Sequence, residues 1–425
     1  MTFEQFIRRK DFVVIPSLHR LIMWLAGFRV LPLGWLALSG WFVTTMMGVS
    51  GIDRPIYLVV CAWTAPGVIA LVFGLLLRPR VLVQPDYPTR GAVGQGLTVH
   101  ADLHNPGRFP QLSIGAGLYL LPLEIDPEPP SDVIAAIGPG ESARFEIGLT
   151  PRRRGHYKMP GVVAFSTFPL HFFRTPAGGS DRWPLLVLPS FHTIHRIDIP
   201  IGTRYQPGGI ALTSHVGESP EFIGNREYVP GDPIRHIDFR AWARLSKPAV
   251  REFQEEYYCR IALVLDTFTG KAEPPTPAGF PDFEAAVSLT AAVADALSRG
   301  EYLIDLFAAG PQLHVFRAGR HTAHLDNVLE ILAGVGHTVD NPFERLAPAL
   351  LEELRNISTV VCVFLDWDKR REHIVRAAAE AGCSVKVVVV RDEDTTESLS
   401  RAHHWTPHVQ QVTVAAVTGG GVDTL

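Results

Sequence analysis

Two adjacent stretches that contain no charged residue limit what this chain can fold into more than any other feature does. Residues 30–52 and residues 56–77 are predominantly apolar, and only residues 53–55, Asp-Arg-Pro, separate them. As helices that rise about 1.5 Å per residue, both stretches are long enough to cross a hydrocarbon core of about 30 Å. The sequence therefore predicts an N-terminal hairpin of two transmembrane helices over residues 30–77. The alternative is a pair of helices buried in a globular domain.

The basic residues that flank these stretches predict the orientation of the hairpin. Arginine and lysine are enriched on the cytoplasmic side of membrane proteins. Residues 1–29 carry five basic residues, and Arg78 and Arg80 directly follow the hairpin. We therefore expect residues 1–29 to form a cytoplasmic or interfacial segment and all later domains to lie in the cytoplasm. This describes a two-span protein of the cell (inner) membrane.

The composition indicates a multidomain protein and gives no reason to expect nucleic acid as a partner. The 425 residues are too many for one ordinary domain. Lysine and arginine (39) are fewer than aspartate and glutamate (43), which gives a net charge of −4. Proteins that bind nucleic acid ordinarily carry a basic surface. The non-protein partner that we expect is membrane lipid, in contact with the two spans.

Residues 81–200 have the pattern of a β domain. Residues 96–107 alternate between apolar and polar positions and end in Asn-Pro-Gly, which is typical of a half-buried strand and its exit turn. Further runs of this kind are separated by Gly and Pro, without an amphipathic helix between them: residues 112–121, 143–149, 161–165 and 185–188. The pattern predicts an all-β, sandwich-like middle domain.

Residues 259–425 alternate between strands and helices. Residues 261–265, 359–365 and 385–390 are apolar runs, as expected for strands that are covered on both faces. Helices are predicted between them, most clearly over residues 282–299, where apolar side chains recur at helical spacing. The alternation predicts a C-terminal α/β domain with a doubly wound parallel sheet.

The segment between these two domains, residues 201–258, is dense in charges of both signs. Its arginines and carboxylates are interspersed with Tyr228, Trp242 and Phe253; they include Arg226, Arg235, Arg240, Arg244, Arg251, Asp232, Asp238, Glu252, Glu255 and Glu256. Two interpretations are open. Arginine–carboxylate pairs lock the segment internally, or arginine and aromatic side chains form an exposed docking surface.

Fixed positions in that segment resemble the signature of the family called domain of unknown function 58. The pattern is Arg226-x-Tyr228-x-x-Gly231-Asp232-x-x-Arg235-x-Ile237-Asp238, followed by Ala243-Arg244. Phe239 departs from it, since Trp is usual there. The resemblance implies a membrane-anchored protein that has a von Willebrand factor A-like C-terminal domain and works with a MoxR-type AAA+ ATPase. The residues expected to bind this partner are Arg226, Tyr228, Gly231, Asp232, Arg235, Asp238, Trp242 and Arg244.

The same resemblance implies a metal site at the carboxyl ends of the α/β strands. An intact site has Asp-x-Ser-x-Ser after the first strand, but this chain has Asp266-Thr-Phe-Thr-Gly. Its threonines are out of register by one residue, which turns them the other way in an extended segment. Asp266, Thr338 and Asp366 remain as a degenerate ligand set for Mg²⁺. A helix cap or loop role also explains each aspartate, so we expect weak metal binding or none.

These features favour a non-enzymatic function. The predicted protein is a membrane-tethered adaptor or client-binding partner of a MoxR-type AAA+ ATPase, without a cofactor of its own. It lacks a Gly-x-x-x-x-Gly-Lys-Ser/Thr phosphate loop, so ATPase activity would belong to the partner. The alternative is a metal-assisted hydrolase that uses Asp266, Asp366 and a histidine such as His236. No Gly-x-Ser-x-Gly or His-Glu-x-x-His motif supports that alternative.

Overall fold

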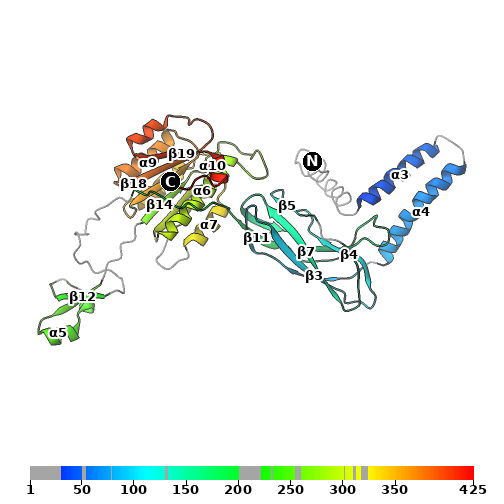
Figure 1. The fold of residues 1–425 in the computed structure, drawn as a ribbon, viewed down its shortest axis with the longest axis horizontal. Coiled ribbons are helices and arrows are strands. Elements are labelled where there is room, and N and C mark those ends of the chain that lie inside the picture. The colour runs from blue at the N-terminus through cyan, green and yellow to red at the C-terminus, as the bar shows by residue number, and fades with distance from the viewer. Residues whose placement is uncertain are drawn as a thin grey trace. The chain divides into compact units, whose positions relative to one another are not determined.

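The structure is a computed structural model that describes residues 30–49, 54–77, 79–129, 133–200, 222–230, 232, 234–253, 260–300, 302–309, 313–316 and 324–425. The chain divides into two compact units, residues 1–190 with 274–279 and residues 191–273 with 280–425. Figure 1 shows helices α3 (Pro32–Val49) and α4 (Arg54–Leu76) with a β-rich region in the first unit and an α/β sheet in the second. The chain is therefore multidomain.

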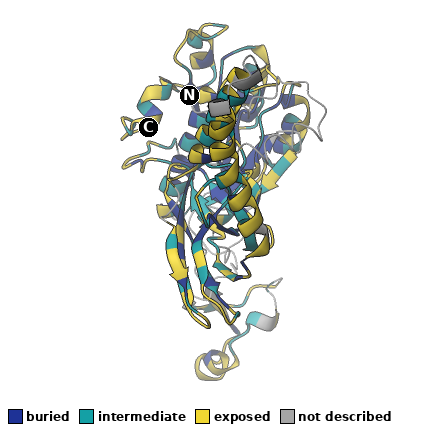
Figure 2. Cartoon of the chain, turned by 90° about the vertical axis from the view of Figure 1, so that its right-hand side faces the viewer, coloured by how far each residue is buried: buried dark blue, intermediate teal, exposed yellow. Residues whose placement is uncertain are grey.

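Helices α3 (Pro32–Val49) and α4 (Arg54–Leu76) follow the two apolar stretches. They are joined through Trp41, whose Nε1 donates to Thr64 Oγ1 at 3.0 Å. Figure 2 shows both helices largely in the colour of exposed residues. One window of α4, Tyr57–Gly74, is long and apolar enough to cross a membrane, with 6% of it buried; among the described residues no other helix, α3 included, meets that criterion. The predicted hairpin of two membrane spans remains a prediction.

Residues 82–188 form a β-rich region of three sheets, with strand orders β1-β3-β7-β5, β10-β9-β4-β6 and β2-β11-β8. Neighbouring strands are antiparallel except β2 and β11, which are parallel. The strands are β1 (Leu82–Asp86), β2 (Arg90–Ala92), β3 (Leu97–His104), β4 (Gln111–Gly117), β5 (Ile125–Pro127), β6 (Ile134–Ile137), β7 (Ser142–Pro151), β8 (Gly155–Met159), β9 (Val163–Ser166), β10 (Thr175–Gly179) and β11 (Trp183–Leu188). The predicted β-rich middle region is confirmed.

The buried faces of these strands share one apolar core. In β3, buried residues alternate with half-buried or exposed ones, as its alternating sequence predicts. Val99, Ala101 and Leu103 lie on its core face. The residue after this strand, Asn105, is buried and donates from Nδ2 to three backbone carbonyl oxygens at 2.9 to 3.1 Å. This asparagine satisfies carbonyl groups in segments beside the end of β3, those of Phe109, Ile137 and Gly138.

The second unit contains a six-stranded sheet of order β16-β15-β14-β17-β18-β19 (Figure 1). Its strands are β14 (Arg260–Leu265), β15 (Leu303–Ala309), β16 (Leu313–Phe316), β17 (Thr359–Phe364), β18 (Ser384–Val390) and β19 (His408–Val412). All pairs are parallel except β15 with β16. Only residues 310–312 separate these two strands, too few for the crossover that parallel pairing requires. The sheet is therefore mixed, and the prediction of an all-parallel sheet is wrong at this edge.

Helices contact both faces of this sheet. They are α6 (Pro281–Arg299), α7 (His324–Gly334), α8 (Phe343–Glu353) and α9 (Lys369–Glu380), with the short 3-10 helix η3 (Leu399–His404); helix α10 (Val414–Thr418) contacts α6. Ala262 and Val264 of β14 share one core with residues of α8 and α9. Leu263 and Leu265 point to the opposite face, and α6 also contacts β14. Coverage on both faces explains why these strands are apolar without alternation.

Candidate functional site

Part of the charge-rich segment folds into a small element that we call the signature module, residues 222–253. It consists of β12 (Phe222–Glu227), the 3-10 helix η2 (Ile234–His236), helix α5 (Phe239–Leu245) and β13 (Ala249–Phe253). The two strands pair antiparallel. Asp238 N donates to Ala249 O at 2.8 Å, and Tyr228 N donates to Pro248 O at 2.9 Å. These bonds hold the chain between the strands against the start of β13.

Arg226 and Asp232 form a two-pronged ion pair in this module. Arg226 Nη1 and Nη2 donate to Asp232 Oδ2 and Oδ1, both at 2.7 Å, and Val229 N donates to Oδ2 at 2.9 Å. The bonds from Arg226 and then from Val229 lower the pKa of Asp232 to about 2, so that it is ionised at neutral pH. The Asp232 side chain is 14% exposed. Its acceptors are therefore used inside the module.

Asp238 caps helix α5. Its Oδ1 accepts from Arg240 N at 3.0 Å and Ala241 N at 3.1 Å, and its Oδ2 accepts from Arg251 Nε on β13 at 3.2 Å. The bond from Ala241 N, with those from Arg251 and Arg240 N, lowers the pKa of Asp238. Aspartate is a preferred N-cap because it accepts from backbone donors that the first helical turn leaves free. A single carboxylate thus begins α5 and connects this helix to strand β13.

Helix α5 exposes three apolar side chains and two arginines to solvent. Phe239, Trp242 and Leu245 are 65%, 39% and 54% exposed, and their spacing of three residues places them on one side of the helix. The rings of Phe239 and Trp242 stack with centroids 6.1 Å apart. Arg240 and Arg244, four residues apart, are also exposed. The described face of this short helix therefore presents aromatic, aliphatic and guanidinium groups to solvent.

The residues expected to bind a partner divide into two groups. Arg226, Asp232 and Asp238 bond within the module, whereas Trp242 and Arg244 are exposed. Tyr228 is half-buried. Gly231 and the side chain of Arg235 lie outside the described residues. Partner binding by any of these residues remains a prediction.

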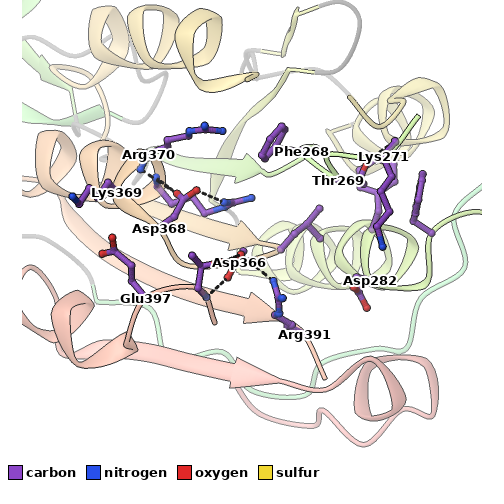
Figure 3. Close-up of a pocket in the computed structure, with 15 residues that line it drawn as sticks. Phe268, Thr269, Lys271, Asp282, Asp366, Asp368, Lys369, Arg370, Arg391 and Glu397 are labelled. Atoms are coloured by element: carbon purple, nitrogen blue, oxygen red, sulfur yellow. Dashed lines mark hydrogen bonds and ion pairs between the residues drawn. The ribbon is translucent and has the colours of Figure 1, made fainter. Parts of the chain in front are cut away.

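A second candidate site lies at the carboxyl edge of the six-stranded sheet. Following the chain, β15 lies on one side of β14 and β17 on the other, and this change of direction marks the place where such sheets bind ligands. A pocket of about 600 Å³ opens at this edge (Figure 3). It is lined by residues after β14, β17 and β18, including Phe268, Asp366, Asp368, Arg370 and Arg391.

Asp266 follows β14 and is completely buried. Its Oδ2 accepts from Arg371 Nε at 2.7 Å, from Arg371 Nη2 at 2.6 Å and from Leu365 N at 3.0 Å. Its Oδ1 accepts from Phe268 N at 2.9 Å. Both oxygens of the aspartate that was expected to bind metal are therefore occupied by protein donors.

The other two expected ligands are also bonded elsewhere. Asp366 accepts from Thr396 Oγ1 at 2.5 Å and pairs with Arg391 at 3.0 Å. Burial alone would raise the pKa of Asp366, but bonds from Thr396 and the nearby Arg391 help to lower it. Thr338 Oγ1 bonds with the backbone of Asp340 at 3.2 Å. Among the described residues no group of three or more acidic, histidine or cysteine side chains is placed to hold a metal, and the donor set does not fit Mg²⁺.

The sequence gives little sign of Arg371, the residue that engages Asp266. It belongs to the run Lys369-Arg370-Arg371 at the start of α9, which is typical of a solvated helix end. Its side chain is nevertheless 2% exposed. The one local signal is the spacing of Asp368 and Arg371, which also pair at 3.0 Å, and many surface helices share that spacing.

Comparison with known proteins finds a family that resembles most of the region that contains both sites. Residues 224–399 match the family described as "Protein of unknown function DUF58". This part of the chain is therefore similar to the DUF58 family. A relative in Bacillus subtilis (strain 168), "Uncharacterized protein YeaD", is 24% identical over 213 residues, which are 49% of this chain and 50% of the relative. The match thus spans about half of the length of that curated relative.

Solved structures resemble this chain only slightly. Proximal thread matrix protein 1 from the mussel byssus matches 40% of this chain and 48% of its own, with 5% identity and a TM-score of 0.28. A CARDB domain from Pyrococcus furiosus matches 26% of this chain and 94% of its own, with 14% identity and a TM-score of 0.19. These values assign no fold to either unit.

Proposed function

We propose that this protein is a membrane-tethered, non-enzymatic adaptor that binds a MoxR-type AAA+ ATPase through the signature module. The observation that carries the proposal is the way the module divides its residues. Ion pairs fix its backbone, while Phe239, Trp242 and Leu245 are exposed beside two arginines. Aromatic residues and arginine supply much of the binding energy at protein interfaces.

In this proposal, the internal-lock and docking interpretations apply to different residues of one module. Arg226, Asp232 and Asp238 hold its shape, and Phe239, Trp242 and Arg244 contact the partner. A module that is already ordered loses little conformational entropy on binding. Substitutions in the two sets should therefore differ: the first set affects the fold of the module, and the second affects affinity alone.

The proposal also includes the placement of the protein in the cell. We assign α3 and α4 to two spans of the inner membrane, with the β-rich region as a sandwich-like spacer and the α/β domain as a von Willebrand factor A-like domain in the cytoplasm. The charge-free stretches and their basic flanks support this assignment. So does the exposure of large apolar side chains on both helices, such as Leu36 (63%) and Leu58 (73%).

The pocket gives no support to a metal-assisted hydrolase. Such a reaction needs a carboxylate that is free to hold a metal or to activate water. Asp266 and Asp366 already pair with Arg371 and Arg391. His236, the candidate base, belongs to the signature module and is not among the residues that line the pocket.

The proposal is tested by the affinity of the full chain, held in nanodiscs, for the purified MoxR-type ATPase of the same organism, with and without ATP. The double variant Phe239→Ser/Trp242→Ser is expected to bind at least about thirtyfold more weakly, because a single hot-spot residue contributes ~2 kcal/mol. Arg376→Ala, an exposed arginine on α9, is the control and should leave affinity unchanged. Equal binding by the double variant would refute the docking face, and no binding by the wild type would refute the partner.

A further inference from the structure

The carboxyl ends of β14 and β17 are joined through one side chain. Asp266, directly after β14, accepts from Phe268 N at 2.9 Å and from Leu365 N, directly after β17, at 3.0 Å. These backbone donors alone would leave a full negative charge in a site with no exposure to water. A buried carboxylate needs a cation or it loses its charge.

Arg371 supplies that cation. Its Nε and Nη2 donate to Asp266 Oδ2 at 2.7 and 2.6 Å, and its Nη1 pairs with Asp368 at 3.0 Å. Asp368 also accepts from the backbone N–H groups of residues 370 and 371, which begins α9. Burial opposes the charge of Arg371, but Asp266 and Asp368 outweigh it and raise its pKa. The guanidinium thus ties two strand ends to the first turn of a helix.

Aromatic rings complete the surroundings of this guanidinium. Its Cζ lies 5.9 Å from the ring centroid of Phe268 and 5.3 Å from that of Phe343. Arg371 and Asp266 are 2% and 0% exposed. Two carboxylates and two ring faces form a cage that is suited to a positive charge, and we call it the Arg371 cage.

We propose that Arg371 is a built-in cation, which holds the ligand edge of the sheet in place of a divalent metal and makes this edge independent of metal ions. Arg371 is then a positioning residue for the pocket. Its guanidinium already pairs with Asp266 and Asp368 and its side chain is 2% exposed, so it acts on a ligand through the position of these groups and not by direct contact. The family resemblance implies Mg²⁺ beside Asp266, and in this chain the guanidinium group of Arg371 takes the place of that ion. Because the two carboxylates remain when the side chain is shortened, the cage of Arg371→Ala is expected to accept a small cation from solution.

The test measures the melting temperature of the α/β domain in the full chain held in nanodiscs, with EDTA, with millimolar Mn²⁺ or with millimolar guanidinium chloride, each matched for ionic strength with KCl. The wild type should melt at the same temperature in all three solutions. Arg371→Ala should melt lower in EDTA and rise with Mn²⁺ or guanidinium. Arg376→Ala, on the same helix with its side chain 44% exposed, should behave as the wild type.

Two results would overturn the proposal. The first is stabilisation of the wild type by Mn²⁺ that disappears in Asp266→Asn, which would show that the site takes a metal although Arg371 is present. The second is a folded Arg371→Ala variant that neither cation stabilises, which would show that the carboxylates do not form a cation cage. If Arg371→Ala does not fold, the neutral pair Asp266→Leu/Arg371→Met replaces it. This pair should fold and be insensitive to both cations; its stabilisation by Mn²⁺ would also contradict the proposal.

Discussion

At the scale of single residues, ion pairs of the same chemistry have different roles in the two candidate sites. Arg226 and Asp232 are 28% and 14% exposed, whereas Arg371 and Asp266 are 2% and 0% exposed. Solvent screens an accessible pair, so its contribution to stability is small. Removing one partner of a buried pair leaves an uncompensated charge where water cannot reach it.

Replacing Asp266 with Ala is therefore expected to lower the free energy of unfolding of the α/β domain by about 3–5 kcal/mol, because Arg371 loses its main buried partner. Urea titration of the full chain, read out by hydrogen exchange in β14 and β17, measures this loss. Arg401→Ala removes a partner of Glu397 that is 52% exposed, and it should change stability little. An Asp266→Ala variant as stable as this control would be inconsistent with a buried ion pair.

Asp232 predicts a pH dependence that is confined to the signature module. Its pKa is about 2 in the folded protein against an ordinary 3.8. A folded-state pKa below the unfolded one contributes stability that is complete above about 3.8 and is lost as the pH falls through 2. In hydrogen exchange of residues 222–253, corrected for intrinsic rates, Asp232→Asn should exchange faster than the wild type at neutral pH. This difference should disappear near pH 2, and a constant difference down to that pH would argue against the pair.

At the scale of elements, α5 depends on its cap because seven residues are too few for a stable isolated helix. Asp238→Ala removes the acceptor of two backbone N–H groups and is expected to speed hydrogen exchange across residues 239–245. Asp238→Asn keeps a cap acceptor and loses only the charge opposite Arg251, so it should exchange nearly as the wild type does. Equal acceleration in both variants would mean that the charge, not the cap, starts this helix.

The regular elements of the α/β domain follow from local pattern, and the sequence predicts them well. Residues 261–265 and 385–390 lie within β14 and β18 because strands covered on both faces must be apolar throughout. Apolar residues at helical spacing predict α6, whose buried side includes Phe283, Val287 and Leu297. The antiparallel edge strand β16 is different, since its direction depends on the length of the connection before it.

The candidate sites are less predictable because their key contacts join residues distant in sequence. Arg371 and Asp266 are 105 residues apart, and nothing near either residue predicts the pair. The charge pattern of residues 224–256 does predict ion pairing. It does not predict which carboxylates face inward, because that depends on the turn after β12 and on the start of α5. Phe239 illustrates the limit: it is exposed and stacked on Trp242, while the sequence marks it only as a departure from the family pattern.

At the scale of the whole molecule, we expect a two-span anchor with the C-terminus in the cytoplasm. A green fluorescent protein fused after Leu425 should fluoresce, and alkaline phosphatase fused there should be inactive, because the first needs the cytoplasm and the second an oxidising compartment. The same reporters placed between α3 and α4 should give the reverse pattern. Fluorescence of the green fluorescent protein at both positions would mean that at most one of these helices crosses the membrane, which would contradict the two-span anchor.

The measurement that tests the adaptor function most directly is site-specific photo-crosslinking in intact cells. A photoreactive amino acid in place of Trp242, on the exposed side of α5, is compared with the same amino acid in place of Arg376 on α9. We expect a crosslink between position 242 and the MoxR-type ATPase. Asp238→Ala should weaken this crosslink, and position 376 should not form it. A crosslink from position 242 only to lipid, or none to the ATPase in cells that contain it, would contradict the proposed function.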